Sequence, residues 1–406
     1  MKKKLVSLLA VGVLALSATS LASCKKEGAV EIAMISDIGT INDSGFNQYT
    51  WEGAKKAAQE LGRPSAYFVP TTDTDDERKA GIDSMIRRGA KAIVLTGYKF
   101  NTLVGEYASR YPNIAWFLID GSQDTAKDLQ NVYSVEFKEQ EAGYLAGYAV
   151  VKDKKYTNLA FMGGMAVPAV ERFGFGYLSG ICDAANELAA AGQLTGNIKV
   201  KYGYTGDFGP SEKNQQNATS WYNDGTDVIF TCGGAICDSV VAAAGKTTNT
   251  KAKMIGVDVN QHPQQPNDLY ITSAEKKVEK TTKEAILTYF NQFAKDATGD
   301  ALTGKWPAAN AGKHTILSST TNSVGLPTEG ENGDNPWTFT NFTKEAYNTL
   351  YAKLQANETY TKVISNNDGA TVYSEAINNS RVEITLTNIG GEVKNKPTVT
   401  VAENLK

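Results

Sequence analysis

Two phenylalanines in glycine-rich segments have the side chains best suited to binding a flat aromatic ligand. Phe46 follows the first apolar run of the sequence and lies among glycine, aspartate and asparagine residues. Phe175 lies between Gly174 and Gly176, in what we take as the matching loop of the second half of the chain. A lone loop phenylalanine more often packs in a core, but two at corresponding places favour a binding role. Because stacking contributes about 1–3 kcal/mol per base, we expect the two rings to enclose an aromatic base.

Charged side chains are expected beside these rings. Asp258 directly follows an apolar run, and one carboxylate can accept hydrogen bonds from both hydroxyls of a vicinal diol, such as that of ribose. Lys276 can donate to ribose oxygens and offset the charge of Asp258, and Asp120 can accept from a purine N–H. The alternative for each aspartate is a turn or a helix cap. For Lys276 the residues alone favour the alternative, a solvated lysine at the start of a helix.

The segment around Phe46 also carries a dense set of short polar groups. These candidates are Asp37, Asn42, Asp43 and Asn47. Asp43 has the alternative role of capping the helix that follows. Later in the chain, Gly233 and Gly234 follow another apolar run, and their lack of a side chain lets the main chain approach a ligand closely. We therefore include the backbone N–H of Gly234 among the candidate ligand contacts.

Composition excludes several kinds of site and partner. The 406 residues include two histidines and no HExxH motif, so we expect no metal site, and the net charge of −3 argues against nucleic-acid binding. No Walker A motif occurs, and the glycines at 174, 176 and 180 have the wrong spacing for a dinucleotide fingerprint. We expect no cofactor. The acidic run at 73–76 could suggest the calcium site of a nucleoside hydrolase, but capping of the following helix explains it better.

The first residues predict export and lipid attachment. Three lysines at positions 2–4 precede a short apolar run from Leu5 to Leu16, which is too short to span a membrane. The segment L-A-S-C at 21–24 then resembles a bacterial lipobox, in which the cysteine receives a diacylglycerol. We predict a signal peptide at 1–23 and a lipid on Cys24 that holds the protein on the outer face of the cell membrane. The alternative is an ordinary signal peptide with an incidental cysteine.

The remainder of the chain alternates β-branched apolar runs with helical spacing. Four strands and three helices are expected within roughly the first ninety residues after position 28, and the pattern restarts near position 158. One of the later helices is expected at 170–191. This pattern predicts two Rossmann-like α/β lobes with parallel sheets, whose polar strand ends at Asp37, Asp120 and Asp258 should face a shared site.

We expect the chain to cross between the lobes near residues 135, 262 and 306. The predicted N-terminal lobe therefore comprises residues 24–135 and 262–305, and the predicted C-terminal lobe comprises 136–261 and 306–360. The segment 361–406 is rich in β-branched residues and is left as an unassigned, strand-rich tail.

The segment at 32–48, I-A-M-I-S-D-I-G-T-I-N-D-S-G-F-N-Q, followed by W-E-G at 51–53, resembles the opening of the basic membrane protein family of lipoproteins. Further matches follow in the same order as in the family. They are W-F-L-I-D at 116–120, G-F-G at 174–176, C-G-G-A at 232–235, I-G-V-D at 255–258, and T-S at 272–273 with Lys276. The resemblance covers roughly 28–355.

This resemblance implies a substrate-binding component of an ABC importer with the type I periplasmic-binding-protein fold. Family members of this kind bind purine nucleosides, so guanosine, adenosine and inosine are the expected ligands and an ABC permease the expected partner. The resemblance also implies that Asp37 and Asn47 touch the ligand, and it is what favours a ligand-binding role for Lys276. We expect a monomer without enzymatic activity. The alternatives are a riboflavin- or sugar-binding protein of the same fold and, less favoured, a nucleoside-processing enzyme.

Overall fold

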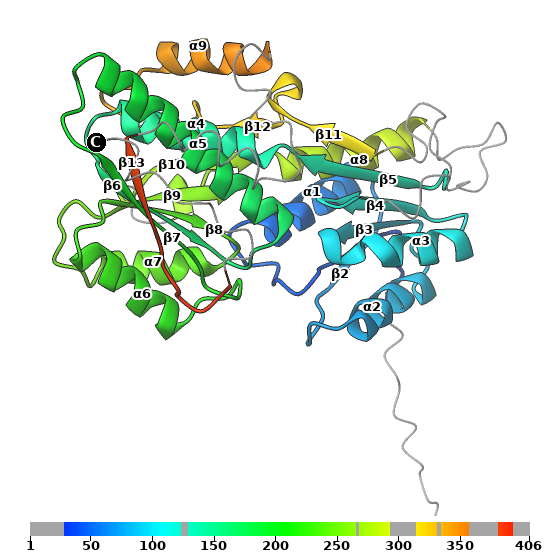
Figure 1. The fold of residues 1–406 in the computed structure, drawn as a ribbon. Coiled ribbons are helices and arrows are strands. Elements are labelled where there is room, and N and C mark those ends of the chain that lie inside the picture. Colours follow the sequence, from blue (N-terminus) through cyan, green and yellow to red (C-terminus); the bar gives the residue numbers. More distant parts are fainter. Residues whose placement is uncertain are drawn as a thin grey trace, which may run out of the picture.

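The computed structural model describes residues 28–122, 129–264, 268–292, 314–330, 334–356 and 381–392. Within these ranges the helices and strands form two α/β lobes, one on each side of Figure 1. Cys24 and the expected signal peptide lie outside the described residues. No helix in the described part of the chain is long and apolar enough to cross a bilayer.

The first lobe contains a six-stranded parallel sheet in the order β11-β5-β4-β3-β1-β2. Its strands are β1 (Ile32–Ile35), β2 (Ser65–Phe68), β3 (Ala92–Thr96), β4 (Ala115–Ile119), β5 (Val132–Phe137) and β11 (His314–Leu317). The strands β1, β3 and β4 are buried along their whole length. Their continuous apolar runs are therefore those of parallel strands that are covered on both faces.

Helices cover both faces of this sheet. They are α1 (Phe46–Glu60), α2 (Asp75–Arg87), α3 (Asn101–Arg110) and α8 (Val278–Gln292), with a 3-10 turn, η1, at Tyr98–Phe100. Alternate residues of β3 divide between the two apolar layers: Val94 packs with α1 and α8, and Leu95 packs with α2 and α3. The acidic run at 73–76 leads into α2, whose N-terminus is capped by the side chain of Thr74.

The second lobe contains a seven-stranded sheet in the order β12-β10-β9-β8-β6-β7-β13, parallel except for β12. Its strands are β6 (Asn158–Gly163), β7 (Ile198–Tyr204), β8 (Val228–Cys232), β9 (Lys253–Asp258), β10 (Tyr270–Lys276), β12 (Val324–Gly325) and β13 (Val382–Leu386). The two sheets confirm the predicted pair of mainly parallel α/β lobes. The strand β13, red in Figure 1, shows that part of the unassigned tail completes the edge of this sheet.

The helices of the second lobe also form two layers. They are α4 (Glu139–Lys152), α5 (Pro168–Ala190), α6 (Glu212–Asn223), α7 (Ile236–Ala244) and α9 (Lys344–Gln355), with 3-10 turns η2 (His262–Gln264) and η3 (Ser319–Thr321). The helices α4 and α5 lie in close contact because glycines face the partner backbone. A Cβ at Gly147 would overlap Tyr177 of α5, and one at Gly180 would overlap Tyr144 of α4.

The chain crosses between the lobes later than the sequence suggested. The strand β10 pairs with β9 in the second sheet, so the second crossing follows Lys276 and does not lie near 262. The strand β11 pairs with β5 in the first sheet, so the third crossing follows Leu317 and does not lie near 306. An apolar run predicts a strand but not the sheet that it joins, which is why these positions could not be located. Backbone hydrogen bonds from Lys138 N to Leu317 O (2.8 Å) and from Lys277 N to Ser323 O (2.9 Å) connect the crossing segments.

Candidate functional site

A cavity of about 460 Å³ lies between the two lobes. Loops at the carboxyl ends of β1, β2, β3 and β4 line it from the first lobe, and loops that follow β6, β7, β8 and β9 line it from the second. Ligands of open α/β sheets bind at this end of the strands, and the volume falls within the usual range of about 300–1,000 Å³ for small-molecule sites.

The structure brings most of the predicted site residues together. The candidates that line the cavity are Asp37, Asp43, Phe46, Asn47, Asp120, Gly234, Asp258 and Lys276. Asn42 is exposed and is not among the lining residues. The predicted convergence of strand-end residues from both halves of the chain is therefore seen for all candidates except Asn42 and Phe175.

The expectation for Phe175 is wrong. Residue 175 lies inside α5, where its buried ring stacks on Tyr202 with 6.5 Å between ring centroids, and it does not line the cavity. The neighbouring Gly176 lets α5 contact the backbone of Gln140 on α4, so the G-F-G segment serves helix packing. Phe173, two residues earlier, does line the cavity. Two positions along a helix correspond to a rotation of about 200°, so the two rings face different sides.

Phe208 is the aromatic residue of the second lobe that sequence reasoning missed. It lies in the loop between β7 and α6 and lines the cavity, as Phe46 does from the first lobe. Its ring packs over Gly164 and Gly233, where a Cβ would collide with it. The available signal was an apolar ring within the polar turn G-D-F-G-P at 206–210. Both lobes thus supply aromatic rings to the cavity, with Phe173 and Phe208 from the second lobe and not Phe175.

The loop after β1 is held in shape by its own polar residues. The carboxylate of Asp43 accepts hydrogen bonds from the backbone N–H groups of Gly45, Asn47 and Gln48, each at 3.0 Å. The side chain of Asn47 donates to Asp43 (3.1 Å) and accepts from Ser36 (2.9 Å). The helix-capping alternative for Asp43 is therefore seen, while both residues also face the cavity.

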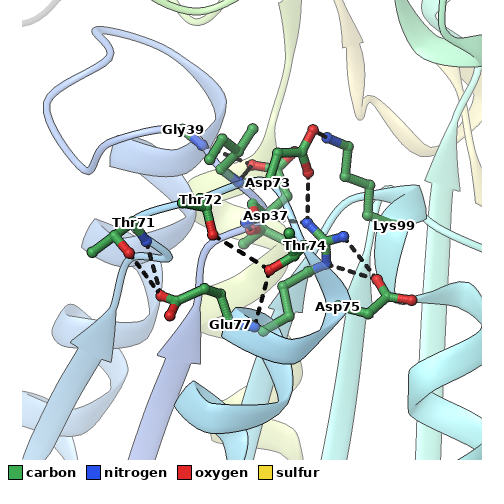
Figure 2. Close-up of polar contacts among 12 residues, drawn as sticks. Asp37, Gly39, Thr71, Thr72, Asp73, Thr74, Asp75, Glu77 and Lys99 are labelled. Carbon is green, nitrogen blue, oxygen red and sulfur yellow. Dashed lines mark hydrogen bonds and ion pairs between the residues drawn. The ribbon is translucent and has the colours of Figure 1, made fainter.

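A network of charges fixes the outer edge of the cavity in the first lobe (Figure 2). The guanidinium of Arg78 is bonded to Asp73 (2.8 Å), to Asp75 (2.7 Å) and to the backbone oxygen of Asp37 (3.3 Å). Lys99 forms a second ion pair with Asp73. Because these residues follow β1, β2 and β3, the network joins three loops that line one side of the cavity.

The inner wall of the cavity contains a buried cluster of charges around Lys276. Its side chain is 3% exposed, and Nζ lies 2.7 Å from Asp120, 3.4 Å from Asp258 and 3.5 Å from Glu139. The other oxygen of Glu139 accepts from Nε of Arg172 at 2.6 Å. Asp120 belongs to the first lobe and Asp258 to the second, so Lys276 bridges the two lobes.

Aromatic rings surround the same ammonium group. Nζ of Lys276 lies 4.8 Å from the ring centroid of Phe46, 5.7 Å from that of Phe173 and 5.8 Å from that of Phe137. Ring faces attract a cation, and this attraction grows as water is removed. The rings therefore stabilise the charged form of Lys276 within the cluster.

Burial and mutual interaction shift the pKa values of this cluster. Burial raises the pKa of Asp258 to about 6, with Lys276 opposing and Asp120 adding to the shift. Burial likewise raises the pKa of Glu139 to about 8, although Arg172 opposes it. For Asp120, burial is outweighed by Lys276 and by a hydrogen bond with Glu139, and its pKa lies below the usual value. Burial and the two cations thus act in opposite directions on the pKa values of these carboxyl groups.

The cysteine thiols and acidic groups described here suit ligand binding better than nucleophilic or metal-dependent chemistry. Cys182, Cys232 and Cys237 are buried and form no disulfide among the described residues, and burial raises the pKa values of Cys232 and Cys237. Such thiols are poor nucleophiles. Among the described residues, no group of three or more histidine, cysteine or acidic side chains is arranged to hold a metal ion.

Gln261 connects the lobes directly on one side of the cavity. Its side chain is 0% exposed, and its Nε2 donates to the backbone oxygen of Ser44 in the first lobe at 2.8 Å. Its Oε1 accepts from Val257 N (3.0 Å) within the second lobe. Because the donor and the acceptor belong to different lobes, this contact is specific to an arrangement in which the lobes are closed. A buried amide seldom lacks a partner, so its loss would be unfavourable.

Comparisons with known proteins agree with this geometry. A family model described as "ABC transporter substrate-binding protein PnrA-like" matches residues 29–300, more than half of the chain. The chain belongs to this family. Its members are substrate-binding components of ABC transporters and not enzymes. This PnrA-like protein is therefore a substrate-binding protein that works with an ABC permease on the extracytoplasmic side of the membrane.

Two relatives resemble this chain in sequence, and a solved structure has the same fold. The chain is 26% identical over 327 residues to the ABC transporter nucleoside-binding protein BmpA of Lactococcus lactis subsp. cremoris, covering 76% of this chain and 87% of that protein. It is 28% identical to basic membrane protein D of Borreliella burgdorferi, covering 63% and 70%. A solute-binding protein of an ABC transporter from Aeropyrum pernix has the same fold, with a TM-score of 0.59, 22% identity, and coverage of 86% and 90%.

We expect Gln261→Met to shift the ligand-free protein toward an open arrangement. The substitution keeps the length of the side chain but removes the donor to Ser44 in the other lobe. Loss of one hydrogen bond of about 0.5–1.5 kcal/mol changes the ratio of open to closed protein by about two- to tenfold. Small-angle X-ray scattering should show a larger radius of gyration than for the wild type. Gln216→Met, on the exposed surface of α6, is the control, and an unchanged radius in Gln261→Met would contradict the prediction.

Proposed function

We propose that this substrate-binding protein binds a purine nucleoside between its lobes and delivers it to an ABC permease. The observation that carries the proposal is the composition of the inter-lobe cavity. It combines aromatic rings from both lobes, among them Phe46 and Phe208, with the buried Asp258–Lys276 pair on its inner wall. A flat base requires aromatic faces and a ribose requires charged hydrogen-bonding groups, and the cavity offers both.

The two parts of a nucleoside correspond to two parts of the cavity. Phe46 and Phe208 stack on the base, and closure of the lobes brings them together. Asp258 accepts from the ribose diol, and Lys276, already charged and held by Asp120, donates to ribose oxygens. The polar groups of the loop after β1, including Asp37 and Asn47, and the backbone of Gly234 complete the set of proposed contacts. Ligand binding then favours the closed arrangement, which the permease recognises.

The Lactococcus relative supports a nucleoside as the ligand, because its name describes it as nucleoside-binding and it aligns with most of this chain. Calorimetry on a form that begins at Lys25 tests the proposal against guanosine, adenosine, inosine, uridine, guanine, riboflavin and ribose. Tight binding of purine nucleosides, with weaker guanine and no ribose, is the expected result. Binding of riboflavin alone would keep the transport role and replace the ligand, and binding of ribose alone would indicate a sugar site.

Replacing either stacking ring should weaken nucleoside binding. We expect Phe46→Ala and Phe208→Ala each to cost at least about 1 kcal/mol, because each removes one face of the base site. Titration calorimetry with guanosine measures the loss. Tyr67→Ala, at an exposed aromatic residue on β2, should leave the affinity unchanged. Wild-type affinity in both cavity variants would remove the stacking site from the proposal.

Affinity should decrease as the pH falls through about 6. The hydroxyls of the ligand bind the ionised form of Asp258, whose pKa is raised to about 6 by burial, so protonation competes with the ligand below that pH. The dissociation constant for guanosine should rise toward about tenfold per pH unit on the acidic side. Asp258→Asn should bind more weakly at pH 8 and lose this dependence between pH 5 and 7. A variant that keeps the wild-type slope would assign the titration to another group.

We also propose that the mature protein is a monomer held at the membrane by a lipid on Cys24. The basis is the lipobox-like segment of the sequence, since residue 24 lies outside the described structure. Cys24→Ala should move the protein from the membrane fraction to the supernatant and leave its affinity for guanosine unchanged. Continued sedimentation with membranes would contradict lipid attachment at this residue.

A further inference from the structure

Arg172 has unused hydrogen-bonding capacity at the inner wall of the cavity. The residue is 8% exposed and lines the cavity. Its Nε donates a hydrogen bond to Glu139 at 2.6 Å. Its Nη1 lies 3.9 Å from Glu136, too far for a hydrogen bond. Among the described residues, neither Nη1 nor Nη2 has a hydrogen-bond acceptor. Because Arg172 lines the cavity, this edge of the guanidinium is available to donate to a ligand there.

Glu139 fixes the direction of that edge. It is the first residue of α4, directly after the first crossing between the lobes, and is 0% exposed. Its two oxygens hold two cations, Arg172 through Oε2 and Lys276 through Oε1. Since Glu139 is not among the lining residues, it acts on a ligand only through these two neighbours, which makes it a positioning residue.

We infer that Arg172 is a further ligand-binding residue, which donates from its free Nη edge to an uncharged oxygen of the bound nucleoside. The inference rests on the proposed function and deepens it. An uncharged oxygen is expected because two carboxylates, Glu136 and Glu139, already flank the guanidinium, and Asp120 and Asp258 lie on the same wall. A phosphate group would bring further negative charge into this surrounding, whereas a carbonyl or hydroxyl adds an acceptor without charge.

Two oxygens of a nucleoside fit this description, and ligand analogues separate them. One is the carbonyl at position 6 of the base, which guanosine and inosine have and adenosine lacks. The other is the 5′-hydroxyl, which adenosine has and 5′-deoxyadenosine lacks. The diol oxygens are assigned to Asp258. Guanosine, inosine, adenosine and 5′-deoxyadenosine therefore form a sufficient panel.

The test compares these four ligands in the wild type and in Arg172→Gln by titration calorimetry. Loss of a hydrogen bond from a charged donor should weaken binding about 10- to 100-fold, and only for ligands that carry the acceptor. If the acceptor is the base carbonyl, guanosine and inosine lose affinity and adenosine does not. If it is the 5′-hydroxyl, all three lose affinity, and 5′-deoxyadenosine binds the variant and the wild type equally.

A matched control and a positioning variant complete the experiment. Arg110 forms an exposed pair with Glu106 on α3, away from the cavity, and Arg110→Gln should leave all four affinities unchanged. Glu139→Gln also acts through Lys276, so it should weaken all four ligands, and it should weaken most those that carry the acceptor for Arg172. A merely structural role of Glu139 would instead weaken all four ligands equally. If Arg172→Gln fails to fold because Glu139 is left unpaired, the double variant Glu139→Gln/Arg172→Gln removes that charge and takes its place.

Three outcomes overturn the inference. One is equal loss for all four ligands in Arg172→Gln, and another is no loss for any of them. In both cases a wild type that binds guanosine keeps the proposed function intact. The third is a wild type that binds none of the nucleosides, which refutes the proposed function and this inference together.

Discussion

The buried ammonium group of Lys276 is the interaction on which the arrangement of the site depends. A charge placed in an apolar interior is stable only with close partners of opposite sign, and here Asp120, Asp258 and Glu139 supply them. These three carboxylates come from the end of β4, the end of β9 and the start of α4. One cation therefore requires three segments, distant in the sequence, to meet at one point.

This requirement couples the state of the site to the relative position of the lobes. Lys276 ends β10 in the second lobe, whereas Asp120 ends β4 in the first, so separation of the lobes would take the lysine away from its shortest ion pair. Closure in turn places Phe46 of the first lobe against the same ammonium group. The ion pairs of Lys276 thus hold the inner wall of the cavity together and also favour the closed arrangement. A ligand with suitable polar groups would add its own contacts to these ion pairs.

The sequence predicted those features that depend on local pattern. The alternation of apolar runs and helical spacing identified both lobes, and the polar residue that ends each run correctly placed Asp37, Asp120 and Asp258 at one cavity.

Features that depend on tertiary pairing could not be obtained from the sequence pattern. The sheet to which β10 or β11 belongs is one example, and the choice between Phe175 and Phe208 is another, because a glycine-flanked ring serves helix packing in one case and the cavity in the other. Glu139 and Arg172 meet only through the contact of α4 with α5. Their signal, acidic and basic residues within otherwise apolar helical segments, did not specify a partner.

The strand β13 lies well beyond the part of the chain that the family model matches, which ends at residue 300. It pairs with Ile198–Tyr202 of β7, and backbone hydrogen bonds continue past it from Thr387 to Tyr202 and from Gly391 to Tyr204. Without it, β7 would present a row of unsatisfied backbone groups at an open sheet edge, which is a template for association between molecules. This late segment thus shields the second lobe from aggregation, and a truncated protein that stops at α9 would lose that protection while retaining every residue that lines the cavity.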